Sequence, residues 1–183
     1  MNWCMANDPD LQGISSQSIL EQNLDILRKF SAFKQLDFEI INLFALMADR
    51  RQYSQDELIF SQGEKLSTAF MILSGDVTLF LIQGEQAFDL ELLHCGDHFA
   101  YMALLADMDA KLSARACCDC ELLTIDRENF RKVMIRFPES CIQVVEKLIQ
   151  ERMARMHRHM QKLLSSLSMG ESTPIDIARS MGM

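Results

Sequence analysis

The chain has 183 residues, of which 49% are hydrophobic and 24% are charged. This size and composition suit one folded domain with an accessory helix and argue against a disordered chain. The net charge of −8 disfavours non-specific binding to nucleic acid or to an anionic membrane. No apolar run approaches the ~18 residues that a membrane-spanning helix needs.

The first part of the chain predicts a loose segment followed by two helices. Residues 1–17 are polar and lack the basic region and apolar core of a secretion signal. Apolar residues then recur at helical spacing over 18–30 and again over about 37–48. The six cysteines of a chain without such a signal are expected to be reduced thiols in a cytoplasmic protein.

The segment 58–75 carries the strongest pattern in the sequence. Two apolar residues lead into a turn at Gly63 and Glu64, and glycine reaches turn conformations that strain other residues. The apolar run 70–73 follows and is stopped at Gly75. A short apolar run between turn signals is typical of a buried strand.

Further strands are predicted after this segment. Residues 77–82 and 122–125 are apolar, and 83–86 is a plausible hairpin turn. Residues 88–92 alternate apolar and acidic side chains, which predicts a strand with one face in water. Many short strands at regular spacing indicate a sandwich or a jelly-roll barrel.

The last part of the chain predicts a short helix and a long one. Asp126 is a good N-cap for a helix over 127–137, and Pro138 suits the first turn of a helix reaching 168. Apolar residues along the long helix keep alternate steps of four and three, as in a coiled coil. This seam predicts a homodimer, and packing of the helix on its own barrel is the alternative. The seam residues are Ile149, Met153, Met156, Met160 and Leu163.

The remaining tail, 169–183, contains a weak similarity to the start of a helix-turn-helix at 175–182. Major-groove reading needs a second, recognition helix. We therefore expect no direct sequence-specific DNA binding, and no membrane partner.

The strand–turn–strand arrangement of 58–75 resembles the signature of the cyclic nucleotide-binding domain family, which includes catabolite-activator-type regulators and protein kinase A regulatory subunits. The resemblance covers about 27–167. It implies a mainly β jelly-roll barrel over 18–137 with N-terminal helices, followed by a long dimerisation helix over 138–168. It also implies a regulatory protein that requires no cofactor, binds cAMP or cGMP, and passes the signal to a separate partner protein through the C-terminal helix.

In this family a short helix after a Gly-Asp turn presents backbone amides to the cyclic phosphate, and the resemblance places this cassette at 96–113. Tyr101 stands where the family has the ribose-binding Glu. Ala110 or Lys111, depending on one residue of alignment, stands where it has the phosphate-binding Arg. Ser113 keeps a hydroxyl that can donate to phosphate. The ligand-binding residues that the resemblance implies are Phe99, Ala100, Tyr101, Met102, Ala103, Leu104, Lys111, Leu112 and Ser113.

These departures leave three interpretations open: cyclic nucleotide binding, a remodelled pocket for another small ligand, and a degenerate, non-binding dimeric module with the same fold. Losing two charged hydrogen bonds would weaken a nucleotide by several kcal/mol, about a hundredfold or more. Tyr101 would either fill an empty pocket or stack on a ligand.

Other chemistry has weaker support in the sequence. We expect no enzyme, because the sequence has no nucleophile elbow, phosphate-binding Gly-rich loop or metalloprotease helix. Cys117, Cys118 and Cys120 invite a metal or redox interpretation. On an extended strand, Cys118 and Cys120 would share one face and Cys117 would point away. We expect core thiols and no metal site.

Overall fold

The structure is a computed structural model that describes residues 16–168. The segment expected to be loose at 1–17 lies outside the described residues except for its last two positions, and the tail expected at 169–183 lies wholly outside them. The chain forms two compact units, which divide between Val145 and Glu146. The first unit contains every described strand, and the second contains the continuing part of the last helix.

Both N-terminal helices predicted from the spacing of apolar residues are confirmed. They are α1 (Ser16–Lys29) and α2 (Phe38–Met47), with the short 3-10 helix η1 (Ser31–Phe33) between them. The ring of Phe33 stacks on Phe44 at 4.8 Å between centroids, and Phe44 stacks on Phe130 of α3 (Arg127–Arg136) at 5.7 Å. Aromatic packing therefore joins the N-terminal helices to the helix that follows the barrel.

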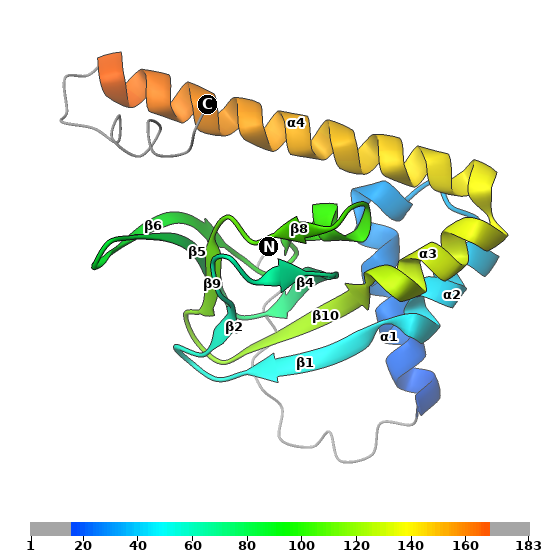
Figure 1. The fold of residues 1–183 in the computed structure, drawn as a ribbon. Helices are drawn as coiled ribbons and strands as arrows, with labels where there is room; N and C mark the ends of the chain where they lie inside the picture. Colours follow the sequence, from blue (N-terminus) through cyan, green and yellow to red (C-terminus); the bar gives the residue numbers. More distant parts are fainter. Residues whose placement is uncertain (1–15, 169–183) are drawn as a thin grey trace. The chain divides into compact units, whose positions relative to one another are not determined.

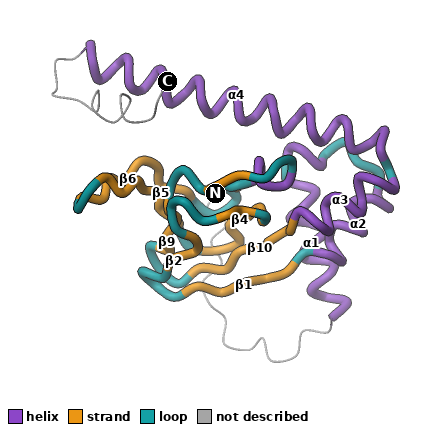
Figure 2. The backbone as a smooth tube through the Cα atoms, viewed as in Figure 1, coloured by secondary structure: helices purple, strands orange, loops and turns teal. Residues whose placement is uncertain are grey.

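The β-rich middle folds as a jelly roll of two four-stranded antiparallel sheets, which confirms the predicted fold class. Figure 2 shows the strands together, with the helices of the same unit at one end. A two-stranded ribbon pairs β3 (Lys65–Leu66) with β8 (Met108–Asp109). The first sheet has the order β1 (Asp49–Tyr53), β10 (Cys120–Asp126), β4 (Thr68–Ser74), β7 (His98–Phe99). The second has the order β2 (Leu58–Phe60), β9 (Ser113–Ala116), β5 (Val77–Gln83), β6 (Gln86–Leu93).

The apolar residues of the two sheets form one core. Burying each large apolar side chain contributes about 1.5–3 kcal/mol, so this cluster is the main source of stability in the barrel. Successive side chains of a β-strand point to opposite faces of the sheet, and the side chains that point inward form this core cluster. Its largest members are Phe60, Leu66, Phe70, Ile72, Leu79, Phe99 and Leu122.

Gly75 makes the turn between β4 and β5 at a place where only glycine fits. Its φ is +80°, and a Cβ at this position would lie 2.6 Å from the Cβ of Cys120 and 2.7 Å from the carbonyl oxygen of Asp119. Both the left-handed backbone and this close approach exclude a side chain. The glycine that ends the predicted strand thus also lets β4 pass close to β10.

One strand prediction is wrong in detail. The alternation in 88–92 predicted that Phe88, Leu90 and Leu92 share an inward face, but Leu90 is 41% exposed and Leu92 is 52% exposed. The pairing of β6 with β5 shifts there, because Leu79 faces Glu91 while the next residue of β5 already faces Asp89. The bulge places an extra residue, Leu90, in β6, and an extra residue reverses the inward and outward positions beyond it.

Both helices predicted after the strands are present. The carboxylate of Asp126 accepts a hydrogen bond of 2.8 Å from the backbone amide of Asn129 and caps α3 (Arg127–Arg136). Helix α4 (Pro138–Ser168) begins at the predicted proline. Figure 1 shows α1, α2 and α3 gathered at one end of the sheets, and α3 contacts both α2 and β10.

Candidate ligand-binding cassette

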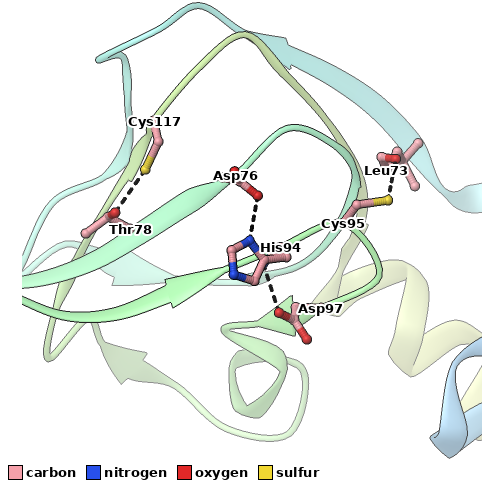
Figure 3. A network of polar contacts seen from close by, with 7 residues as sticks. All are labelled: Leu73, Asp76, Thr78, His94, Cys95, Asp97 and Cys117. Carbon is pink, nitrogen blue, oxygen red and sulfur yellow. Dashed lines mark hydrogen bonds and ion pairs between the residues drawn. The ribbon is translucent and has the colours of Figure 1, made fainter. Parts of the chain in front are cut away.

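The cassette begins at a turn that is fastened to β4. The amide of Gly96, whose φ is +90°, donates to the carbonyl oxygen of Ile72 at 2.9 Å. The carboxylate of Asp97 accepts from the amide of His94 at 2.9 Å, and the Nδ1 atom of His94 lies 2.8 Å from a carboxylate oxygen of Asp76 (Figure 3). These contacts fix the Gly-Asp turn, so β7 starts from a defined point.

The chain then enters the short cassette helix through a left-handed residue. Phe99 pairs with Phe70 across β7 and β4, and the two rings stack at 5.1 Å. Ala100 follows with a φ of 57°, a conformation that costs a residue with a Cβ about 1–2 kcal/mol. Its carbonyl oxygen accepts from the amide of Ala103, which closes the 3-10 helix η2 (Tyr101–Leu104).

Tyr101, at the position of the family's ribose-binding Glu, is buried in this structure. The residue is 4% exposed, and the centroid of its ring lies 5.1 Å from that of His98. Both side chains line an apolar cavity formed with Phe30 and Phe33 of the N-terminal segment and with residues of β4, β7 and β10. Of the two roles predicted for Tyr101, the packing role agrees with this placement.

The far end of the cassette closes onto the Gly-Glu turn. The amide of Gly63 donates to the carbonyl oxygen of Ala110, and the amide of Ala110 donates to the carbonyl oxygen of Glu64, both at 2.8 Å. The Ala110 side chain belongs to the core cluster, whereas Lys111 is exposed. The two residues considered for the position of the family's Arg therefore lie in opposite environments, and the cation lies at the surface.

Ser113 is buried, and its hydroxyl accepts a hydrogen bond of 2.9 Å from the backbone amide of Gln62. The side-chain oxygen of Gln62 accepts in turn from the amide of Ile82 at 3.1 Å. Sequence reasoning missed Gln62, because nothing in its neighbourhood distinguishes it from a solvated turn residue. The structure thus joins Ala110 and Ser113, both at the far end of the predicted cassette, to the same turn at Gln62–Glu64.

Of the other predicted cassette residues, Ala103 and Leu104 are buried and Met102 and Leu112 are partly buried. One carbonyl group of the cassette accepts a hydrogen bond from a buried cation that the sequence reasoning also missed. Arg127, the first residue of α3, donates to the carbonyl oxygens of Ala103 and Leu66 and to the carboxylate of Asp107. A cation in the first turn of a helix opposes the helix dipole, and this anomaly was the signal available in the sequence.

The cysteine cluster differs from the strand-based expectation. Residues 117–119 form a bend, so Cys118 is exposed while Cys120 is buried in β10, and the two do not share a face. Within 16–168, no group of three or more His, Cys, Asp or Glu side chains is arranged to hold a metal ion. Burial, with smaller effects from Cys118 and Cys117, raises the pKa of Cys120 to about 11. The Cys120 thiol is therefore protonated near neutral pH and is a poor nucleophile.

The predicted dimer seam lies on the part of α4 that forms the second unit. Its members are exposed by 39–56% of their area: Ile149, Met153, Met156, Met160 and Leu163. Large apolar side chains exposed at heptad spacing are typical of an interface. The described helices include none with the length and apolar content required to span a membrane.

Comparison with known proteins agrees with this geometry. The profile of the cyclic nucleotide-binding domain matches residues 50–137. The cGMP-dependent protein kinase egl-4 of Caenorhabditis briggsae is 31% identical over 172 residues, which cover 81% of this chain and 23% of the kinase. The chain thus spans about a quarter of that relative.

Two solved structures share the fold. The catabolite activator protein of Thermus thermophilus is 30% identical with a TM-score of 0.59, and the match covers 76% of this chain and 71% of that protein. A cyclic nucleotide-binding domain from Methylobacillus flagellatus superimposes with a TM-score of 0.69 at 18% identity, covering 80% of this chain and 83% of that domain.

Proposed function

Because the chain belongs to the cyclic nucleotide-binding domain family, we propose that it is a regulatory sensor. In this proposal the cassette at 96–113 receives cAMP, cGMP or a related small anionic ligand, and no cofactor is required. Two relatives support both nucleotides, since one is a cGMP-dependent kinase and another a cyclic AMP receptor protein. The proposed role is regulatory and not catalytic.

The observation that carries the proposal is the pair of 2.8 Å backbone hydrogen bonds between Ala110 and the Gly63–Glu64 turn. They bring two segments more than 40 residues apart into one closed loop. A small ligand held between a turn and a short helix would meet backbone groups whose positions are already fixed, which lowers the entropy lost on binding.

Isothermal titration calorimetry with cAMP and cGMP tests this proposal directly. A saturable heat with one site per chain is the expected result. Absence of heat with both nucleotides at millimolar concentration, for a chain whose folding is verified by circular dichroism, would contradict it.

The alternative function is a degenerate dimeric interaction module that binds no nucleotide. The specific observation in its favour is that the methyl group of Ala110 is buried in the core, with Lys111 directed to the surface and Tyr101 packed in an apolar cavity. A phosphate would then lack the charge-assisted hydrogen bond that an Arg provides.

In both functions α4 forms a homodimer along its apolar seam. In the sensor, a separate protein receives the signal. A ligand would shift the arrangement of the C-terminal helix only by its differential affinity for two states. A cytoplasmic location belongs to the same proposal, and it is supported by the free thiols of the described cysteines. The expected absence of direct DNA binding stays a prediction, because residues 175–182 lie outside the described residues.

A further inference from the structure

Arg127 is unusual among the charged residues of the structure. Its side chain is 10% exposed, and among the described residues it is the only cation in the buried class. Three of its nitrogen atoms donate to three different segments: Nε to the carbonyl oxygen of Ala103, Nη2 to that of Leu66, and Nη1 to the carboxylate of Asp107. A single side chain therefore connects η2, the β3–β8 ribbon and the loop between them.

The backbone of the same residue is held as well. The amide of Arg127 donates to the carbonyl oxygen of Ser67 at 2.7 Å, and the preceding Asp126 caps α3. The beginning of α3 is thus fixed to the segment linking β3 and β4 by its main chain, and to the cassette by its side chain. Any displacement of η2 must either move α3 or break these hydrogen bonds.

The chemistry of the group explains why an Arg is needed. The guanidinium is planar, remains charged, and presents five donors in a fixed fork, whereas Lys has one compact ammonium group. A buried cation is tolerated when its hydrogen bonds are satisfied, and the fork of Arg127 satisfies them with two carbonyl groups and one carboxylate. Asp107 is the only charged partner, and its side chain is 95% exposed.

We infer that Arg127 is a positioning residue that couples the cassette to α3. The inference deepens the proposed function, since it names the contact through which occupancy of the cassette would reach the helix that precedes α4. Coupling requires that each side respond to a change on the other, and this property is measurable without any ligand.

Hydrogen exchange of the full chain, followed by mass spectrometry, tests this coupling. In Arg127→Lys, exchange of the amides at 102–107 should rise on the order of tenfold or more, while exchange in β10 stays unchanged. Arg131→Lys is the matched control, because Arg131 is an exposed Arg on the same helix. A uniform rise through β10 would assign Arg127 to global stability only and would overturn the inference, as would no rise at 102–107.

A second test replaces Asp107, the exposed partner of Arg127. It remains available if the Arg127→Lys variant does not fold. Asp107→Ala should raise exchange in the first turn of α3 about threefold, and Asp109→Ala, a neighbouring exposed aspartate, should not. Equal hydrogen exchange in these two variants would refute the coupling.

In a final experiment, cAMP should protect the amides of both 102–107 and 127–131 from exchange in the unmodified chain. If cAMP changes neither segment, nucleotide binding fails while the ligand-free comparisons still decide the role of Arg127.

Discussion

The hydroxyl oxygen of Ser113 accepts a hydrogen bond of 2.9 Å from the backbone amide of Gln62. This contact joins the first residue of β9 to the Gly-Glu turn, across a separation of 51 positions in the sequence. The side chain expected to contact a phosphate is therefore already part of the architecture, although its hydroxyl hydrogen can still be donated to a ligand.

Replacing this hydroxyl should reduce stability. Ser113→Ala removes this hydrogen bond, and because Gln62 is exposed its amide can bond to water instead, so the free energy of unfolding should fall by about 0.5–1.5 kcal/mol. Urea denaturation followed by circular dichroism measures the change. Ser61→Ala, in the exposed part of the same turn, is the control and should change stability by less than ~0.5 kcal/mol.

The exposed ammonium group of Lys111 is the nearest match in sequence to the cation that binds phosphate in the family. If it serves this role, Lys111→Ala should weaken cAMP binding up to about tenfold, because an exposed charge contributes ~1 kcal/mol. The thermal stability of the Lys111→Ala variant should match that of the unmodified chain. Lys34→Ala, an exposed lysine outside the cassette, serves as control in calorimetry, and equal affinities for both variants would exclude Lys111 as the anchor.

Placing the cation at the neighbouring position should have the opposite effect. Ala110→Arg puts a guanidinium at the end of the cassette, where it could form a charge-assisted bond to phosphate, and cAMP affinity should rise tenfold or more. The same change should lower the melting temperature of the free protein, because Ala110 is 3% exposed and an unpaired buried charge is unfavourable. A variant that is destabilised and gains no affinity would show that the site has lost its nucleotide geometry.

The proposed dimer depends on the apolar seam of α4. Met156→Glu combined with Met160→Glu would bury two carboxylates per chain in the interface, and the dimer dissociation constant should rise a hundredfold or more. Size-exclusion chromatography with light scattering distinguishes dimer from monomer. Ala154→Glu adds a charge at an exposed position off the seam and should leave the mass unchanged, so a dimer that survives the double substitution would disprove this interface.

The buried thiol of Cys120 predicts a loss of stability at alkaline pH. Its pKa is raised from 9.0 to about 11, mainly by burial, so the folded state holds its proton more tightly than the unfolded state. The stabilisation is complete below about pH 9 and decreases as the pH rises toward 11, by roughly 2–3 kcal/mol in total. Denaturation curves at several pH values should show a smaller decrease in Cys120→Ala.

Cys118→Ala is the control for this measurement, because Cys118 is exposed. It should retain most of the alkaline decrease, since burial is the largest cause of the raised pKa of Cys120 and Cys118 is a smaller one. Some decrease should remain in Cys120→Ala as well, since burial also raises the pKa of Cys141. If the free energy of unfolding depended on pH in the same way in both variants, Cys120 would not be the cause of the alkaline decrease.

Local patterns in the sequence determined much of this fold. Gly63 and Gly75 adopt positive φ at the predicted turns, Asp126 caps α3, and Pro138 begins α4. Each of these features depends on one residue and its immediate neighbours, since backbone sterics and capping act over three or four positions. For the same reason the helices and the four longest strands, β4, β5, β6 and β10, were predicted close to their observed bounds.

Tertiary structure alone decided the features that depend on distant segments. The bulge at Leu90 results from pairing with β5, the burial of Tyr101 from packing against Phe30 and Phe33, and the contacts of Arg127 from segments up to 61 residues away. Hydrogen bonds and packing between residues so far apart produce no repeating pattern in the sequence, so they could not be predicted from it. The sequence by itself determined the barrel, whereas folding decided which side chains of the predicted cassette face the core, the surface or α3.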